Sequence, residues 1–173
     1  RMAGVLGKSE EAELYRKKYE QMAEKINSLM WCEEDGCYYN LKFDGTFSRK
    51  QSPDCFMPLM TGLVPQDRKE KMLKLLKDKN KFWGEYMIPS ISRDDPAFQQ
   101  QHYWRGQVWP PQTLWTYLSL KRAGEDELAW KLAWKAAAML EKEWKENGFV
   151  PENYNAITGR CSGSPHYNWG VLM

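Results

Sequence analysis

The sequence lacks any long uninterrupted apolar stretch. No segment approaches the roughly 18 consecutive apolar residues of a membrane-spanning helix, and the residues after Arg1 do not form the apolar core of a signal peptide. We therefore expect no membrane partner and favour a cytoplasmic location. Because the sequence begins at Arg1 and stops within an apolar segment at Met173, we also expect it to be a fragment of a longer protein.

Clustered charge and metal-binding patterns are also missing. The 25 Lys and Arg residues and 23 Asp and Glu residues are interspersed and give a net charge of +2. Since nucleic-acid binding requires a basic patch or stripe, we expect no nucleic-acid partner. The sequence has two His and four Cys, and Cys32, Cys37, Cys55 and Cys161 match neither zinc nor C-x-x-C redox spacing. We expect free thiols, no metal site and no cofactor.

Aromatic side chains, in contrast, are plentiful. The 173 residues suffice for one domain with a hydrophobic core, and they include nine Trp and nine Tyr. Large aromatic residues serve either as core or as stacking surfaces for sugars and bases. Trp130, Trp134 and Trp144 recur at helical spacing, so we expect them in the core. We expect the same of Phe56.

Apolar residues recur at intervals of three and four over most of the chain, which favours a mainly α fold. The expected helices cover residues 9–31, 52–63, 66–77, 110–123 and 125–147, and another begins at Pro165. Aromatic and polar residues alternate around Asp44 and Gly45, which predicts a small β-hairpin over residues 37–47. Residues 80–107 have no period and are expected to form a long ordered loop with functional residues.

Distinctive motifs follow this loop and the last long helix. The three strongest blocks are Ile88-Pro89-Ser90 with Asp94-Asp95-Pro96, then Tyr103-Trp104-Arg105-Gly106-Gln107-Val108-Trp109-Pro110-Pro111, then Glu152-Asn153-Tyr154-Asn155 with Thr158-Gly159. Two weaker blocks are Trp31 with Asp35-Gly36-Cys37-Tyr38-Tyr39, and Ser164-Pro165-His166-Tyr167 with Trp169-Gly170. In this order the blocks resemble the trehalase-like (α/α)6-barrel glycosidases, most of all glycoside hydrolase family 63.

The resemblance implies a barrel of six inner and six outer helices, with a sugar pocket formed by the loops at one end. Residues 1–173 would then be the C-terminal half of the catalytic domain, including a small β-hairpin. Its partners would be an oligosaccharide or disaccharide substrate, and either the missing N-terminal half of the barrel or a second copy of the chain. The implied activity is inverting hydrolysis of α-linked glucosides or mannosides.

The resemblance also assigns roles to particular residues. Inverting hydrolysis uses a general acid and a general base roughly 6.5 to 9.5 Å apart. Glu152 matches the family's general base, whereas the family's acid is an Asp in an earlier loop that this sequence does not contain. The implied substrate-binding residues are Trp104, Arg105, Gly106, Trp109, Asn153, Tyr154, His166 and Trp169.

Simpler readings of these residues remain open at this point. Trp104 and Trp109 are equally typical of a core, with Arg105 paired to Asp94 or Asp95, and Tyr154 is equally typical of a packing residue. At the level of the whole chain, the alternatives are a non-catalytic carbohydrate-binding module that has lost the acid, and an α/α scaffold without a sugar site.

Overall fold

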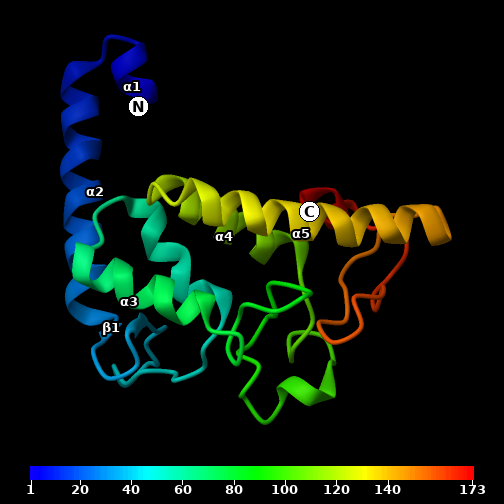
Figure 1. The fold of residues 1–173 in the computed structure, drawn as a ribbon. Helices are drawn as coiled ribbons and strands as arrows, with labels where there is room; N and C mark the ends of the chain where they lie inside the picture. The colour runs from blue at the N-terminus through cyan, green and yellow to red at the C-terminus, as the bar shows by residue number, and fades with distance from the viewer.

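The fold consists of helices and one short hairpin in the computed structural model, which describes residues 1–173 (Figure 1). The α-helices are α1 (Met2–Val5), α2 (Ser9–Leu29), α3 (Gln66–Lys77), α4 (Pro110–Arg122) and α5 (Asp126–Asn147). The 3-10 helices are η1 (Pro53–Thr61), η2 (Phe98–Gln100) and η3 (Asn168–Leu172), and the strands are β1 (Trp31–Cys32) and β2 (Cys37–Tyr38). The expected mainly α fold with a small hairpin is confirmed. No helix is both long enough and apolar enough to cross a bilayer.

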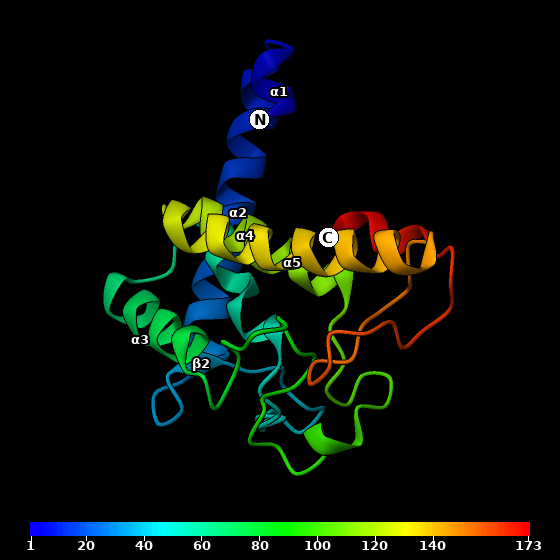
Figure 2. The same ribbon diagram turned by 45° about the vertical axis from the view of Figure 1, so that its right-hand side comes forward.

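Helix α4 occupies the centre of the arrangement and contacts η1, α5 and η3. It begins at two prolines, which suit the first turn because their missing N–H groups have no partner there. The side chains that it buries are mostly small and hydroxylated, namely those of Thr113, Thr116 and Ser119. Small side chains allow neighbouring helices to approach closely, and α4 and α5 run side by side in both views (Figures 1 and 2).

The tryptophans of α5 face away from this contact, so the prediction that they belong to the core is wrong. Trp130, Trp134 and Trp144 are 61%, 62% and 58% exposed. The buried stripe of α5 instead consists of Ala129, Leu132, Ala136, Met139 and Glu143. Small alanines on that stripe fit against α4, and the bulky indoles of Trp130 and Trp134 pack edge to face on the outer surface, 5.7 Å apart.

The hairpin lies earlier in the chain than predicted. Strands β1 and β2 pair antiparallel, with Trp31 opposite Tyr38, around a turn that contains Gly36 at a φ of 63°. The tight turn expected at Asp44 does form, because the Asp44 carboxylate accepts from the Thr46 amide at 2.9 Å. That turn is closed by a single isolated bridge, from Leu41 to Phe47, and not by a regular ladder.

Two expected α-helices are 3-10 helices instead. Residues 53–61 form η1, which contains Pro58 in its interior. A proline lacks the backbone N–H that an α-helix needs, which explains the tighter and shorter form. The segment after Pro165 likewise forms only the short η3. The expected helix over 9–31 ends at Leu29, where β1 soon follows.

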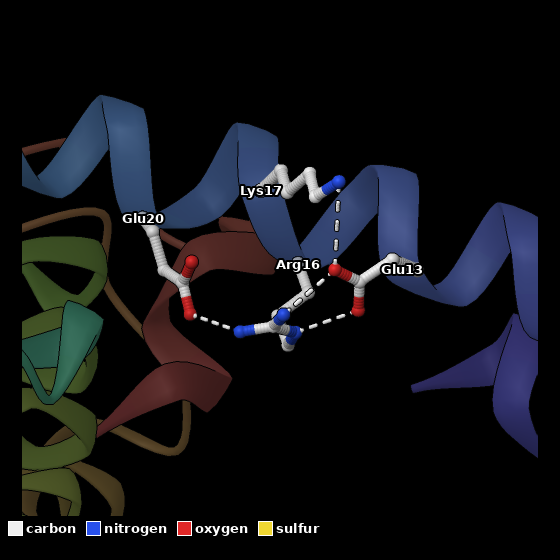
Figure 3. Close-up of polar contacts among 4 residues, drawn as sticks. All are labelled: Glu13, Arg16, Lys17 and Glu20. Atoms are coloured by element: carbon white, nitrogen blue, oxygen red, sulfur yellow. Dashed lines mark hydrogen bonds and ion pairs between the residues drawn. The ribbon is translucent and has the colours of Figure 1, made fainter.

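The N-terminal half of α2 stands clear of the rest of the molecule (Figures 1 and 2). The only buried residue of α2 is Ala23, in the C-terminal half, whereas Tyr15 and Tyr19 are 60% and 41% exposed. Local ion pairs stabilise the helix here: the Arg16 guanidinium reaches Glu13 and Glu20, each at 2.7 Å (Figure 3). The hydrogen bond from Arg16 is the main reason why the pKa of Glu13 is lowered.

The main hydrophobic core lies between η1, α3, α4 and α5. It consists of Tyr38, Phe56, Leu59, Met72, Leu73, Leu76, Phe82, Met87, Ile88, Leu120, Ala129 and Leu132. Phe56 is fully buried, as predicted, and its ring meets that of Phe82 edge to face at 5.1 Å. Burial of these side chains is the dominant stabilising contribution.

Replacing Phe56 by Ala should lower the free energy of unfolding by about 3–5 kcal/mol, because it leaves a cavity in the main core. Trp134→Ala is the matched control, and it should change stability by no more than about 0.5 kcal/mol, since the side chain is exposed. Urea unfolding followed by far-UV circular dichroism measures both. Equal losses in the two variants would contradict this assignment of core and surface.

Candidate functional site

A backbone ladder of four segments brings the three strongest sequence blocks together. Isolated β-bridges join Pro89 to Val108, Val108 to Tyr154 and Tyr154 to Cys161. The central pair is joined by two hydrogen bonds: the Val108 amide donates to the Tyr154 carbonyl at 2.8 Å, and the Tyr154 amide donates to the Val108 carbonyl at 3.0 Å. Segments that are distant in the sequence therefore lie side by side at one end of α4 and α5.

Glu152 begins the hairpin of residues 152–164, which forms the outer part of this ladder. Its outgoing strand is residues 152–155 and its returning strand is residues 160–164. The Glu152 amide donates to the Ser164 carbonyl at 2.9 Å, and the Ser164 amide returns a bond to Glu152 Oε2 at 3.3 Å. The Oε1 atom accepts no hydrogen bond within the chain, and the residue is half-buried. Glu152 therefore presents a positioned carboxylate with one oxygen available to another molecule.

Gly163 packs directly against this carboxylate. A Cβ atom at Gly163 would lie 2.9 Å from both Cβ and Oε2 of Glu152, and 2.7 Å from Nδ2 of Asn153. Real Cβ atoms essentially never approach so closely, so only glycine fits between these side chains without a shift. Sequence reasoning missed this residue, since an isolated glycine in an irregular segment gives no indication of its neighbours.

Asn153 and Tyr154 are both buried, at 1% and 0% exposure. Asn153 Oδ1 and the Tyr154 hydroxyl have no hydrogen-bond partner within the chain. Tyr154 packs with Phe98, Val108 and Met139 in a second core cluster, as the packing interpretation predicts. Burial, followed by the negative charge of Glu143, raises the pKa of Tyr154. Its phenol is therefore neutral over the physiological range.

The aromatic residues of the second block form a cluster with Trp169 of η3. The Trp104 ring stacks on Trp109, with ring centres 3.9 Å apart and planes inclined by 15°. Trp169 meets Trp109 edge to face at 6.1 Å, and Tyr103 does so at 4.9 Å. Trp109 is fully buried, whereas Trp104 and Trp169 are 40% and 37% exposed. Trp109 thus supports the cluster from beneath, and Trp104 offers an accessible indole.

Arg105 is exposed and its guanidinium makes no hydrogen bond within the chain. Asp94 pairs with Lys81, and Asp95 pairs with Lys50 at 2.8 Å, so the alternative that Arg105 pairs with either aspartate is wrong. Arg105 and Trp104, together with His102 and Tyr103, line an open hollow of about 330 Å³. An unpaired guanidinium beside an exposed indole suits recognition of a hydroxylated ligand.

The two aspartates of the first block are ionised structural residues. The hydrogen bond from Lys50 lowers the pKa of Asp95. Burial would raise the pKa of Asp94, but hydrogen bonds from Lys81 and Ser92 outweigh it and the pKa is lowered. A general acid must hold a proton near neutral pH, so neither carboxyl group suits that role.

Gly106 allows a close approach of two backbone segments. Its φ is 110°, and a Cβ atom there would lie 2.6 Å from the Phe98 carbonyl oxygen. Its amide donates to Ser90 Oγ at 3.1 Å. The structure thus accounts for Gly106 by contacts within the chain, between the loop and η2.

His166 packs against Phe149 and not against a ring of the aromatic cluster. The residue is exposed, has a φ of 55°, and packs its ring against Phe149 at 5.6 Å. Two residues of the last block were expected to bind substrate. The structure places Trp169 in the aromatic cluster, whereas His166 is exposed on the surface.

Two glutamines to which the sequence assigned no role hold the site together. Gln107, which is 4% exposed, donates to the Gln101 carbonyl at 3.0 Å and to Ser162 Oγ at 2.5 Å. The Gln101 side chain accepts from the Ala156 amide at 2.7 Å. These bonds fasten the Glu152 hairpin to the aromatic block. The only signal in the sequence is their position, since Gln107 lies within the second block and Gln101 lies two residues before it.

The sequence profile of the mannosylglycerate hydrolase MGH1-like glycoside hydrolase domain matches residues 1–170. The chain is 27% identical over 195 residues to mannosyl-oligosaccharide glucosidase of Saccharomyces cerevisiae, and the match covers 99% of this chain and 23% of that protein. It is 30% identical over 149 residues to mannosylglycerate hydrolase of Thermus thermophilus, over 83% of this chain and 34% of that one. The chain therefore spans about a quarter to a third of these relatives.

Solved structures agree on the fold. A family 63 mannosylglycerate hydrolase from Thermus thermophilus in complex with glucose superimposes with a TM-score of 0.79 at 23% identity, over 98% of this chain and 41% of that one. Neutral trehalase from Saccharomyces cerevisiae superimposes with a TM-score of 0.73 at 19% identity, over 91% and 29%. The expected relation to trehalase-like helical barrels is confirmed. Since the profile spans nearly its whole length, the chain belongs to the MGH1-like glycoside hydrolase domain family, within glycoside hydrolase family 63.

Proposed function

We propose that the chain is the C-terminal half of the catalytic domain of an inverting α-glycosidase, with Glu152 as general base. The observation that carries this proposal is the state of the Glu152 carboxylate: Oε2 is tethered by the Ser164 amide and Oε1 has no partner within the chain. A general base must be fixed in place yet keep a lone pair for the attacking water. The general acid then comes from the part of the barrel that residues 1–173 do not include.

Groups of the second and third sequence blocks suit a sugar substrate. Trp104 provides an accessible indole for the apolar face of a pyranose, and Arg105 an unpaired guanidinium for its hydroxyl groups. Asn153 Oδ1 is buried without a partner, a state that a hydrogen bond from water or a sugar hydroxyl would relieve. Relatives named mannosylglycerate hydrolase and mannosyl-oligosaccharide glucosidase favour an α-linked mannoside or glucoside as the substrate.

Glu152→Gln in the full-length protein should lower kcat on aryl α-glucosides and α-mannosides by at least about 10²–10⁴-fold, because the amide cannot deprotonate water. Binding measured by calorimetry should persist, since the Gln side chain can still accept from Ser164. Glu146→Gln, an exposed change on α5, is the control. An active Glu152→Gln variant would rule out the assigned base. Sugar binding by the wild type without any hydrolysis would favour the carbohydrate-binding alternative.

Inversion makes a separate prediction about the product. Attack of water on the face opposite the leaving group converts an α-glycoside into the β-anomer of the free sugar. Proton NMR during the first minutes of turnover, before mutarotation, should therefore detect the β-anomer first. Early appearance of the α-anomer would indicate a retaining mechanism instead.

Gly163→Ala should reduce kcat while leaving the fold intact. The added methyl group would displace the Glu152 carboxylate, and a shift of about 1 Å in a catalytic group can cost about 10²-fold in rate. Gly4→Ala is the matched control, because nothing lies within 4 Å of a Cβ atom at that position. Steady-state kinetics measure kcat for each variant, and the melting temperature shows whether its fold is intact. Wild-type kcat in Gly163→Ala would show that this contact does not hold the carboxylate in its working position.

A further inference from the structure

Glu143 is a buried carboxylate in the last turn of α5. It is 5% exposed, and the helix ends four residues later at Asn147. A negative charge at this end of a helix is opposed by the partial negative charge of the unpaired carbonyl groups. Burial adds a further desolvation cost. Both effects oppose a carboxylate at this position, so the contacts of Glu143 must offset them.

Those contacts lead to the hairpin that carries Glu152. Glu143 Oε2 accepts from the Cys161 amide at 3.2 Å, and Oε1 accepts from Asn147 Nδ2 at 2.6 Å. Cys161 is the residue that bridges Tyr154 across the hairpin. The returning strand continues through Gly163 and Ser164, which contact the Glu152 side chain. Glu143 thus fixes the returning strand at a point three residues before the amide that tethers the Glu152 carboxylate.

The hairpin has other ties, and one of them also reaches the returning strand, at Ser162. Val108 holds its outgoing strand, and Gln101 holds Ala156 near its tip. Gln107 reaches Ser162 from the aromatic block. The hydrogen bond to Glu143 connects the returning strand to α5. Helix α5 in turn packs along α4.

We propose that Glu143 is a positioning residue for catalysis: by anchoring the Cys161 amide to α5, it sets the place of Gly163 and Ser164 and thereby the orientation of the Glu152 carboxylate. Glu143 does not touch the substrate or the reacting atoms. This inference rests on the proposed role of Glu152 as general base.

The test compares Glu143→Ala, Glu143→Met and Glu143→Gln in the full-length protein. Met keeps the volume but cannot hold the Cys161 amide, so it should lower kcat by about ten- to 10²-fold with little change in KM. Gln can still accept from that amide while Asn147 turns its own amide, so kcat should stay within about threefold of the wild type. Glu146→Gln, on the same helix but exposed, is the control.

Hydrogen exchange separates positioning from general stability. In Glu143→Ala and Glu143→Met, the amides of Cys161 and Ser164 should exchange at least about tenfold faster, while the amides of α4 keep their protection. Wild-type kcat in a folded Glu143→Met variant, or unchanged exchange at Cys161, would overturn the proposal. If Glu152→Gln proves active, the base assignment fails, and the exchange rates still decide whether Glu143 anchors the hairpin.

Discussion

The pairing of Val108 with Tyr154 is the interaction on which the site depends. Two backbone hydrogen bonds join the strand-like segment before α4 to the segment after α5. One residue beyond Val108 lies Trp109, which supports the aromatic cluster, and two residues before Tyr154 lies Glu152. The sugar-stacking surface and the carboxylate of the proposed mechanism therefore share one short backbone frame. The antiparallel pair α4 and α5 brings the two segments to the same end of the molecule.

The fold could be predicted from the sequence wherever local signals agreed. Helical periodicity located α2, α3, α4 and α5 to within about two residues, because apolar spacing, proline starts and glycine ends pointed to the same boundaries. The tryptophans of α5 show where this reasoning fails. Spacing identifies a stripe but not which of two stripes is buried, and here the alanine stripe faces α4. Likewise, apolar residues predicted a helix over 52–63, and the structure has a 3-10 helix there, with Pro58 in its interior.

The site could be predicted only in part. Motif resemblance identified the segments that meet, and the structure places Trp104, Trp109 and Trp169 in one cluster. The supporting residues were not predictable, because Gly163, Gln107 and Glu143 act through neighbours that are distant in sequence or lie across a turn. Such contacts depend on the three-dimensional path of two loops. The close approach of Gly106 to the backbone of η2 was not predictable either.

The distribution of tryptophans has a spectroscopic consequence. Of the nine indoles, only that of Trp109 is buried, and six, including the three on α5, are exposed. Indoles in contact with water emit at long wavelength, so we expect the six exposed indoles to change their emission little when the chain unfolds. The informative signal is that of Trp109, which is fully buried and stacks on Trp104. A chain that retained Trp109 and Trp104 alone would report optically on the site and on little else.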